Sequence, residues 1–217
     1  STAKGETTTL GRSGSDYTAA ILASALNAQV LEIWTDVSGV LTCDPKMVYA
    51  AFTIPQLSYS EAMELSHFGA KVIFPATMQP AMKKNIPIQI KNTFDPSHPG
   101  TLINGEVREG GWIKGISSRS NLTLMTLQSA GWMAAGGSLG RIFTILSEAR
   151  LSSLLISQAS SQHSICLALA TEEAILAKEL IEQLLHLGND RESLLIQRVA
   201  FSPPILVGVG GFFELPE

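Results

Sequence analysis

The sequence predicts an α/β fold in its first half and a smaller α+β unit in its second half. The first half places a helix-forming run before a short strand, a polar loop and a further helix, which is the alternation of α/β proteins. Between residues 122 and 187, strands and helices follow in the order β, α, β, β, α. That order indicates a split βαβ, or ferredoxin-like, unit.

The first helix is expected over residues 16–27, where alanine and leucine predominate. Ser13, Ser15 and Asp16 precede or open this run and are candidates for its N-cap. The β-forming run QVLEIW, residues 29–34, predicts a strand. Residues 35–45, TDVSGVLTCDP, predict a loop, because Asp, Ser, Gly and the Asp-Pro pair form turns.

Ser58, followed three residues later by Glu61, forms a capping-box pattern that predicts the start of a second helix. Ala62, Leu65 and Phe68 continue it at helical spacing. Gly69 then stands where a left-handed residue ends a helix.

The next segment predicts a short helix and a strand. A proline at its first position can open a helix over residues 75–82. Residues 86–92, IPIQIKN, alternate as an edge strand, where a proline is tolerated. Residues 93–100, TFDPSHPG, are rich in turn formers and predict a boundary.

The second half is expected to contain six strands and two helices. Its helices are predicted from apolar periodicity and its strands from β-forming runs. The strands are expected at residues 112–118, 122–129, 152–158, 163–170, 193–199 and 204–211, and the helices at 138–149 and 171–187.

Composition excludes some classes of function. The 15 Lys and Arg residues are scattered among 19 Asp and Glu residues, for a net charge of −4, so nucleic-acid binding is not expected. No apolar run has the length of a membrane span, and the first residues have no apolar signal core. We therefore expect a cytoplasmic protein with a buried core, since 45% of its residues are hydrophobic.

Residues 7–28 contain a candidate anion site. Gly11 and Gly14 let the backbone approach a ligand, Arg12 offers a planar fork, and the helix that follows points its free N–H groups at the same place. Asp16 could orient an ammonium group or a metal-bound phosphate. An ordinary capped turn explains the same residue types equally well.

Three further groups of polar residues are candidates for ligand binding. Thr35 and Asp36 follow a strand, at the edge where open α/β sheets bind ligands, although a turn-forming Asp is the commoner case. Lys71 could reach a phosphate or only favour a helix end. Gln158, Ser160, Ser161, Gln162 and Ser164 form either a polar turn or a site for a small amino acid or sugar.

Five blocks of this sequence resemble aspartokinases, in the same order and at compatible spacing. They are TTLGRSGSDYTAA, IWTDVSGVLTCDP, AMELSHFGAKVIFPATMQPA, NIPIQIKNTFDPSHPGT and LISQASSQHSI. The resemblance implies an amino-acid kinase fold, a three-layer α/β/α sandwich, followed by ACT domains with the ferredoxin-like plan. It also implies transfer of phosphate from Mg-ATP to the side-chain carboxylate of L-aspartate, which gives 4-phospho-L-aspartate, the first step toward lysine, threonine and methionine.

The resemblance assigns roles to individual residues. Arg12 and Ser15 would contact aspartate, and Asp16 would position the substrate and the phosphoryl group. Residues that would bind ATP are Thr35, Asp36, Lys46 and Lys71. An effector, threonine or lysine, would contact Gln158, Ser161 and Ser164. A homodimer through the ACT domains is also implied.

This sequence departs from the family in several places. The family usually has Gly where Ser13 stands, an aromatic residue at Leu41 and Arg at Lys46. The Lys-Phe-Gly-Gly-Thr-Ser turn that opens aspartokinases is missing here. We therefore expect a fragment, with the C-terminal part of a catalytic domain at residues 1–105 and an ACT-type regulatory domain at residues 106–217, its second ACT domain truncated.

Two functional alternatives stay open. The chain is either part of the kinase or an amino-acid-sensing regulatory subunit without catalysis. Whether a homoserine dehydrogenase follows, as in bifunctional relatives, is also open.

Overall fold

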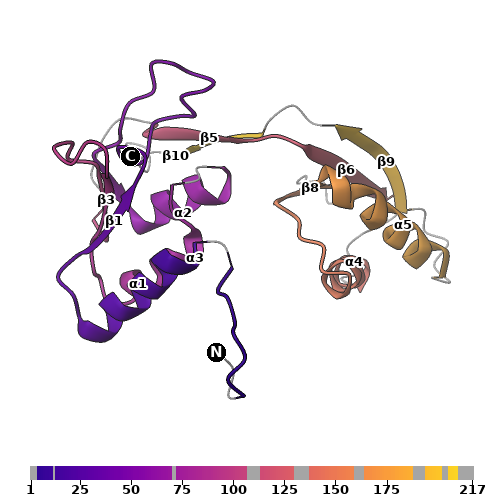
Figure 1. Ribbon diagram of the computed structural model, residues 1–217. Helices are drawn as coiled ribbons and strands as arrows, with labels where there is room; N and C mark the ends of the chain where they lie inside the picture. Colours follow the sequence, from indigo (N-terminus) through magenta and orange to yellow (C-terminus); the bar gives the residue numbers. More distant parts are fainter. Residues whose placement is uncertain are drawn as a thin grey trace, which may run out of the picture. The chain divides into compact units, whose positions relative to one another are not determined.

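The computed structural model describes residues 4–11, 13–69, 72–106, 113–129, 137–158, 164–187, 194–201 and 205–209. It contains two compact units (Figure 1). The first unit comprises residues 1–118 with 206–217, and the second unit comprises residues 119–205. The domain division at residues 105 and 106 stays a prediction.

A four-stranded mixed sheet forms the centre of the first unit, in the order β1-β3-β4-β2. Its strands are β1 (Leu31–Thr35), β2 (Gln56–Ser58), β3 (Ile88–Asn92) and β4 (Thr101–Asn104). β1 runs parallel to β3 and β2 runs parallel to β4, whereas β3 and β4 are antiparallel. Because β1 and β3 are parallel, their carboxyl ends lie at the same edge of the sheet.

Three helices cover one face of this sheet: α1 (Gly14–Leu26), α2 (Tyr59–His67) and α3 (Pro75–Met82) (Figure 1). The strands alternate accordingly, since Leu31 and Ile33 of β1 are buried while Glu32 and Trp34 are exposed. One apolar cluster joins the helices to the sheet, and it includes Ala20, Leu57, Leu65, Met78, Ile88, Ile90 and Ile103. The predicted α/β class is confirmed.

The strand predicted within residues 86–92 is confirmed as β3, but its expected edge position and the boundary expected at residues 93–100 are wrong. β3 is an interior strand, because it lies between β1 and β4. Pro87 precedes the strand, and its carbonyl oxygen accepts a hydrogen bond from Leu31 N at 2.8 Å, so its missing N–H group costs nothing in the ladder. Residues 93–100 are not a boundary, since they lead into β4 of the same sheet.

The second unit has the ferredoxin-like plan. Its elements are β6 (Leu122–Ser129), α4 (Gly137–Glu148), β7 (Leu155–Gln158), β8 (Ser164–Ala170), α5 (Thr171–Leu187) and β9 (Leu194–Phe201). The sheet order is β7-β8-β6-β9, and each neighbouring pair is antiparallel. Both helices pack on the sheet through one cluster that includes Met125, Leu127, Ile142, Leu146, Leu167 and Ile181.

A separate two-stranded sheet pairs β5 (Gly115–Arg119) with β10 (Ile205–Val209) (Figure 1). β5 precedes the ferredoxin-like elements in the chain, and β10 follows them. The sequence predicts both strands but not their pairing.

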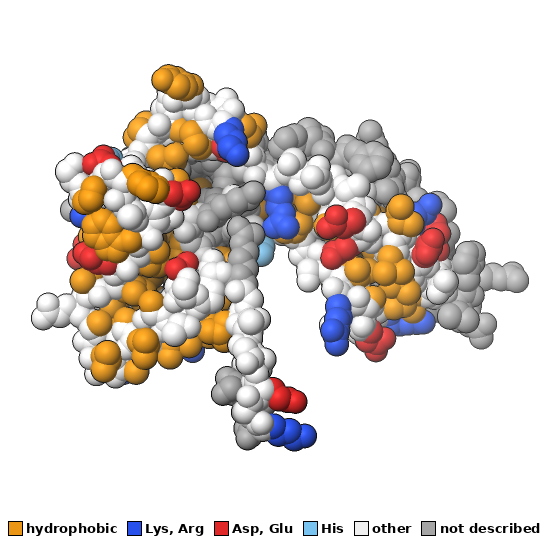
Figure 2. All heavy atoms as spheres, in the orientation of Figure 1, with side chains coloured by type: hydrophobic (Ala, Val, Ile, Leu, Met, Phe, Trp, Pro, Cys, Tyr) orange, Lys and Arg blue, Asp and Glu red, His pale blue; other side chains and the backbone are white. Residues whose placement is uncertain are grey.

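Apolar side chains are also found on the surface, where Figure 2 shows them in orange. In α1 these are Ile21, Leu22 and Leu26, so this helix is apolar on its outer side as well as toward the sheet. Such a surface would be stabilised by contact with further protein. None of the helices in the described ranges combines the length and apolarity needed to cross a lipid bilayer.

Candidate functional site

The turn before α1 holds its backbone in the left-handed region at two positions. Gly11 has φ +74°, and Ser13, the N-cap residue, has φ 55° and ψ 31°. Glycine adopts these angles freely, whereas serine does so at a cost of about 1 kcal/mol or more. This explains why a glycine suits the position of Ser13, where the resemblance expects one. Arg12 lies outside the described residues.

Ser13 makes no side-chain hydrogen bond to the start of α1. The first-turn N–H groups of the helix therefore lack the acceptor that an N-cap side chain normally provides. Together with the positive end of the helix dipole, these groups favour a negatively charged ligand at this place. The anion site itself stays a prediction.

Ser15 and Asp16 lie in the first turn of α1. Ser15 Oγ donates a hydrogen bond to Asp16 Oδ1 at 3.3 Å, and the Asp16 side chain is half-buried. Ala20 and Ala23, which are four and seven residues after Asp16 and so share its face of the helix, are buried against the core. The packing of α1 thus fixes both polar residues beside the turn.

Thr35 and Asp36 lie at the carboxyl end of β1, as predicted. Thr35 Oγ1 donates a hydrogen bond to Asp36 Oδ1 at 3.1 Å, and the carbonyl oxygen of Thr35 accepts one from Thr93 N at 2.8 Å. The Asp36 side chain is exposed. Its carboxylate is therefore accessible to a ligand at this edge of the sheet.

Two residues at the same edge were missed by the sequence analysis. Asn92 ends β3, and its Nδ2 donates a hydrogen bond to Ser38 Oγ at 2.9 Å. This bond joins the loop after β1 to the end of the neighbouring strand. The only signal in the sequence is a polar residue at the end of each of two strands.

Residues 36–54, which we call the nucleotide loop after its implied role, leave the sheet and return to it. The hydroxyl of Thr101, a fully buried side chain, accepts a hydrogen bond from Val40 N at 2.8 Å and donates one to Ile54 O at 2.7 Å. Val40 O also accepts a bond from Ile54 N at 2.8 Å. Both ends of the loop are thus held to β4 through one side chain.

Lys46 lies in the outer part of this loop. Its backbone N–H donates a hydrogen bond to Asp44 Oδ1 at 2.8 Å, and the N–H groups of Met47 and Val48 bond to the carbonyl oxygen of Asp44. The Lys46 side chain is exposed, so its ammonium group can approach a phosphate. Lys71, the other predicted cation, lies outside the described residues.

A further carboxylate follows β3. Ser97 Oγ donates a hydrogen bond to Asp95 Oδ1 at 2.6 Å, and this bond lowers the pKa of the Asp95 carboxyl. Asp95 consequently remains ionised in weak acid. The turn-forming residues of this segment predicted a boundary, and nothing in the sequence singled out Asp95.

The structure brings predicted residues together only in local pairs. Ser15 contacts Asp16, and Thr35 contacts Asp36. Among the described residues, no hydrogen bond or ion pair joins the first pair to the second. The prediction therefore requires a ligand, charged at both ends, that bridges the two pairs.

In the second unit, Gln158 ends β7 and Ser164 begins β8. Gln158 is exposed and Ser164 is half-buried. Ser161 lies outside the described residues. All four residues of β7 are exposed, so this edge strand has room for a further strand or ligand.

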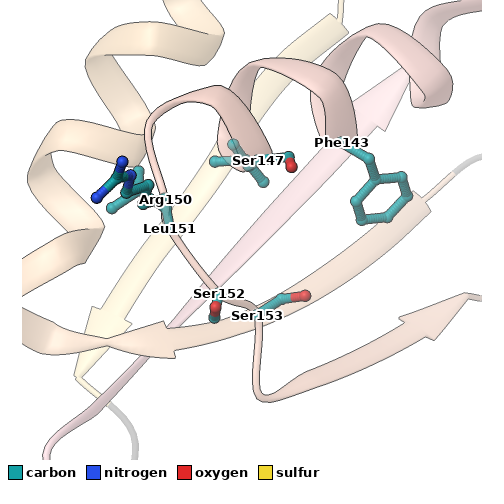
Figure 3. Close-up of a pocket in the computed structure, with 7 residues that line it drawn as sticks. Phe143, Ser147, Arg150, Leu151, Ser152 and Ser153 are labelled. Atoms are coloured by element: carbon teal, nitrogen blue, oxygen red, sulfur yellow. The ribbon is translucent and has the colours of Figure 1, made fainter. Parts of the chain in front are cut away.

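A cavity of about 270 Å³ lies elsewhere in the second unit, at the carboxyl end of α4 (Figure 3). Neither Gln158 nor Ser164 lines it, and the hydroxyls of Ser147 and Ser152 belong to exposed residues. It therefore does not coincide with the predicted effector residues.

The comparisons with known proteins decide the family. Residues 1–92 match the amino acid kinase family, and residues 126–185 match the ACT domain. A bifunctional aspartokinase/homoserine dehydrogenase of Haemophilus influenzae is 49% identical over 180 residues. The chain is homologous to aspartokinases.

Solved structures agree with this assignment. Aspartate kinase of Clostridium acetobutylicum superposes on 94% of this chain, with a TM-score of 0.77 and 32% identity. Escherichia coli aspartokinase III in complex with aspartate and ADP superposes on 95% of it, with a TM-score of 0.71 and 36% identity. The same enzyme with lysine and aspartate gives a TM-score of 0.68, also at 36% identity over 95% of this chain.

The chain spans less than half the length of these relatives. The matched region is 82% of this chain but 22% of the Haemophilus protein. It corresponds to 46% of the Clostridium chain, and to 44% and 43% of the two Escherichia coli chains.

Proposed function

We propose that this chain is part of an aspartate kinase, which transfers the terminal phosphoryl group of ATP to the side-chain carboxylate of L-aspartate. The product is 4-phospho-L-aspartate, which begins the synthesis of lysine, threonine and methionine. The observation that carries the proposal is the uncapped amino end of α1 with Asp16 in its first turn. The cytoplasm stays our prediction for its location.

The turn before α1 suits the amino-acid substrate. The first-turn N–H groups of α1 offer hydrogen bonds to a carboxylate, and Arg12 would add a planar cation next to them. Asp16 would orient the ammonium group of aspartate or the phosphoryl group in transfer. Ser15 holds Asp16 through a hydrogen bond of 3.3 Å and would also contact the substrate.

The carboxyl edge of β1 and β3 suits the nucleotide. Thr35 and Asp36 would hold ATP at this edge, and Lys46 and Lys71 would neutralise its phosphates. Phosphoryl transfer depends mainly on positioning and on charge neutralisation, so these groups suffice without a covalent nucleophile. A relative solved in complex with aspartate and ADP supports a protein that takes both kinds of ligand.

Magnesium would arrive with the nucleotide. Mg²⁺ keeps several waters and needs only one or two protein carboxylates in addition to phosphates. The described residues contain no group of three candidate metal ligands. Asp16 would help to orient the metal-bound phosphate.

The second unit would sense an amino acid. We assign threonine or lysine as the effector, with Gln158, Ser161 and Ser164 as its contacts. A relative bound to lysine supports the class of ligand. The exposed edge strand β7 would also serve to pair two copies into a homodimer.

The second candidate is an amino-acid-sensing subunit without catalysis. The observation that favours it is the second unit itself, in which all six ferredoxin-like elements and one continuous core are present. The two candidates differ in whether the first unit binds nucleotide.

Calorimetric titration of Mg-ATP, L-aspartate, L-threonine and L-lysine into the gene product that carries residues 1–217 separates them. Under the kinase proposal, Mg-ATP binds, and Asp36→Asn weakens its binding. Glu32→Gln is the matched control, because Glu32 is an exposed acid on β1, the strand that Asp36 directly follows. If an amino acid binds but Mg-ATP gives no binding heat, the amino-acid-sensing subunit is the function that remains.

A further inference from the structure

The strand β5 lies in the chain directly before the ferredoxin-like unit. Only residues 120 and 121 separate it from β6, the first strand of the ferredoxin-like unit. β10, which follows the last strand of that unit, pairs with β5. β5 is therefore the strand through which the chain leaves the first unit.

β5 is hydrogen-bonded to the nucleotide loop. Ile116 N donates to the carbonyl oxygen of Thr42 at 2.7 Å. Ser118 Oγ lies 3.4 Å from Met47 Sδ, one residue beyond Lys46. Ile116 and Ser118 of β5 thus contact the loop on either side of Lys46, which is a predicted ATP ligand.

β5 also packs closely against α2 and the base of the loop. A Cβ atom added to Gly115 would lie 3.0 Å from Cδ1 of Ile54 and 3.4 Å from Cδ1 of Leu65. A Cβ atom added to Gly69 would overlap the carbonyl oxygen of Ser118. Both glycines let the backbones approach, so a small shift of β5 cannot occur without moving its neighbours.

A buried ion pair fixes the start of this strand. Lys114 Nζ lies 2.7 Å from Glu61 Oε1, and the two side chains are only 11% and 9% exposed. The other oxygen of Glu61 accepts the hydrogen bond from Ser58 N at 2.7 Å that closes the capping box of α2. The carboxylate of Glu61 is therefore shared between the start of α2 and the start of β5.

Buried ion pairs contribute little net stability, and their best-attested use is to set register. An apolar pair would fill the same space, but without a directional contact it would not specify the register of β5 against α2. The Lys114–Glu61 pair defines one position of β5, and β5 in turn contacts the nucleotide loop at Thr42 and Met47.

We propose that Lys114 and Glu61 are positioning residues for nucleotide binding, which act by holding β5 against residues 40–54. This inference rests on the proposed function of the first unit. Neither residue needs to contact ATP. Their effect is transmitted through the hydrogen bond from Ile116 to Thr42 and the close packing at Gly115.

The test compares Lys114→Met with Lys178→Met in the gene product that carries residues 1–217. Lys178 forms an exposed pair with Glu182 in α5, so its substitution removes the same charge without burial. Two measurements are made on each variant: the Kd for ADP, and amide hydrogen exchange in residues 40–54. Lys114→Arg, which keeps the charge, is the conservative variant.

We expect Lys114→Met to raise the Kd for ADP about fivefold or more, the lower end of ordinary coupling between sites. Exchange in residues 40–54 should accelerate in the same variant. Lys114→Arg should restore both values in part, and Lys178→Met should leave both unchanged. If Lys114→Met does not fold, the double substitution Lys114→Met with Glu61→Gln removes both buried charges and should still accelerate exchange in the loop.

The inference is overturned if a folded Lys114→Met protein, or the double variant, exchanges residues 40–54 as the unsubstituted protein does. It is also overturned if exchange accelerates while the Kd for ADP stays the same. A protein that binds no ADP before substitution contradicts the proposed function instead, and the exchange data then still report whether the ion pair holds the loop.

Discussion

Replacement of Thr101 by valine tests how the nucleotide loop is held. The Thr101 hydroxyl is fully buried and bonds to Val40 N at 2.8 Å and to Ile54 O at 2.7 Å. Valine has nearly the same shape but no hydroxyl, so both backbone groups would lose their partner. A buried polar group left without a hydrogen bond costs about 1–3 kcal/mol, so the loss of two partners should lower the free energy of unfolding by about 2–6 kcal/mol.

Urea-dependent hydrogen exchange, followed in peptides of β1, β3 and β4, measures this loss. A single melting temperature is less suitable, because the chain has two compact units that need not unfold together. Thr101→Ser is the control. It keeps the hydroxyl and removes one buried methyl group, which costs about 1 kcal/mol.

Equal stability of Thr101→Val and Thr101→Ser would refute the argument. It would mean that losing the hydroxyl with its two hydrogen bonds costs no more than losing one buried methyl group. Faster exchange at residues 36–54 with no change in β1 and β3 would instead place the effect in the loop alone.

Three further substitutions test separate elements of the first unit. Ser58→Ala removes the capping box that Ser58 forms with Glu61 and should lower stability by about 1 kcal/mol in the same exchange assay, whereas Ser58→Thr should retain most of it. Burial raises the pKa of Tyr59, so the folded protein keeps the phenol proton above the ordinary pKa of about 10. The resulting stability is present below about pH 10 and lost as the pH rises further, and urea midpoints of Tyr59→Phe should not show this alkaline decline. Gly100→Ala should cost about 3 kcal/mol or more, because Gly100 has φ +76° and an added Cβ would overlap the carbonyl oxygen of Ile90; a urea midpoint near that of the unsubstituted protein would contradict the backbone geometry.

The sequence predicts long or well-capped elements best. α5 (Thr171–Leu187), β6 (Leu122–Ser129) and α3 (Pro75–Met82) begin and end where their patterns predict. Periodicity over many residues and a proline at the first helical position are local signals. They are enough to predict the bounds of these elements from the sequence. β2 (Gln56–Ser58) and β4 (Thr101–Asn104) were missed, because three or four residues are too few for alternation to be recognised.

Non-local pairing explains the remaining errors. β3 was expected at an edge, but it is interior because β4 pairs with it from beyond the turn-rich segment 93–100. The same limit applies to the site. Asp16 lies in the first turn of a helix and Asp36 lies at the end of a strand, as the residues around them predict. Thr101, in contrast, bonds to Val40 from 61 residues away, and no local pattern in the sequence indicates such a contact.

Mapping of ligand protection by hydrogen exchange tests the central claim most directly, that the first unit holds both a nucleotide and an amino acid. The gene product that carries residues 1–217 is exchanged alone, with Mg-ADP, and with L-aspartate. We predict that Mg-ADP slows exchange in residues 35–54 and that L-aspartate slows it in residues 13–20. Protection confined to residues 155–187, with residues 13–54 unchanged by either ligand, would contradict the account.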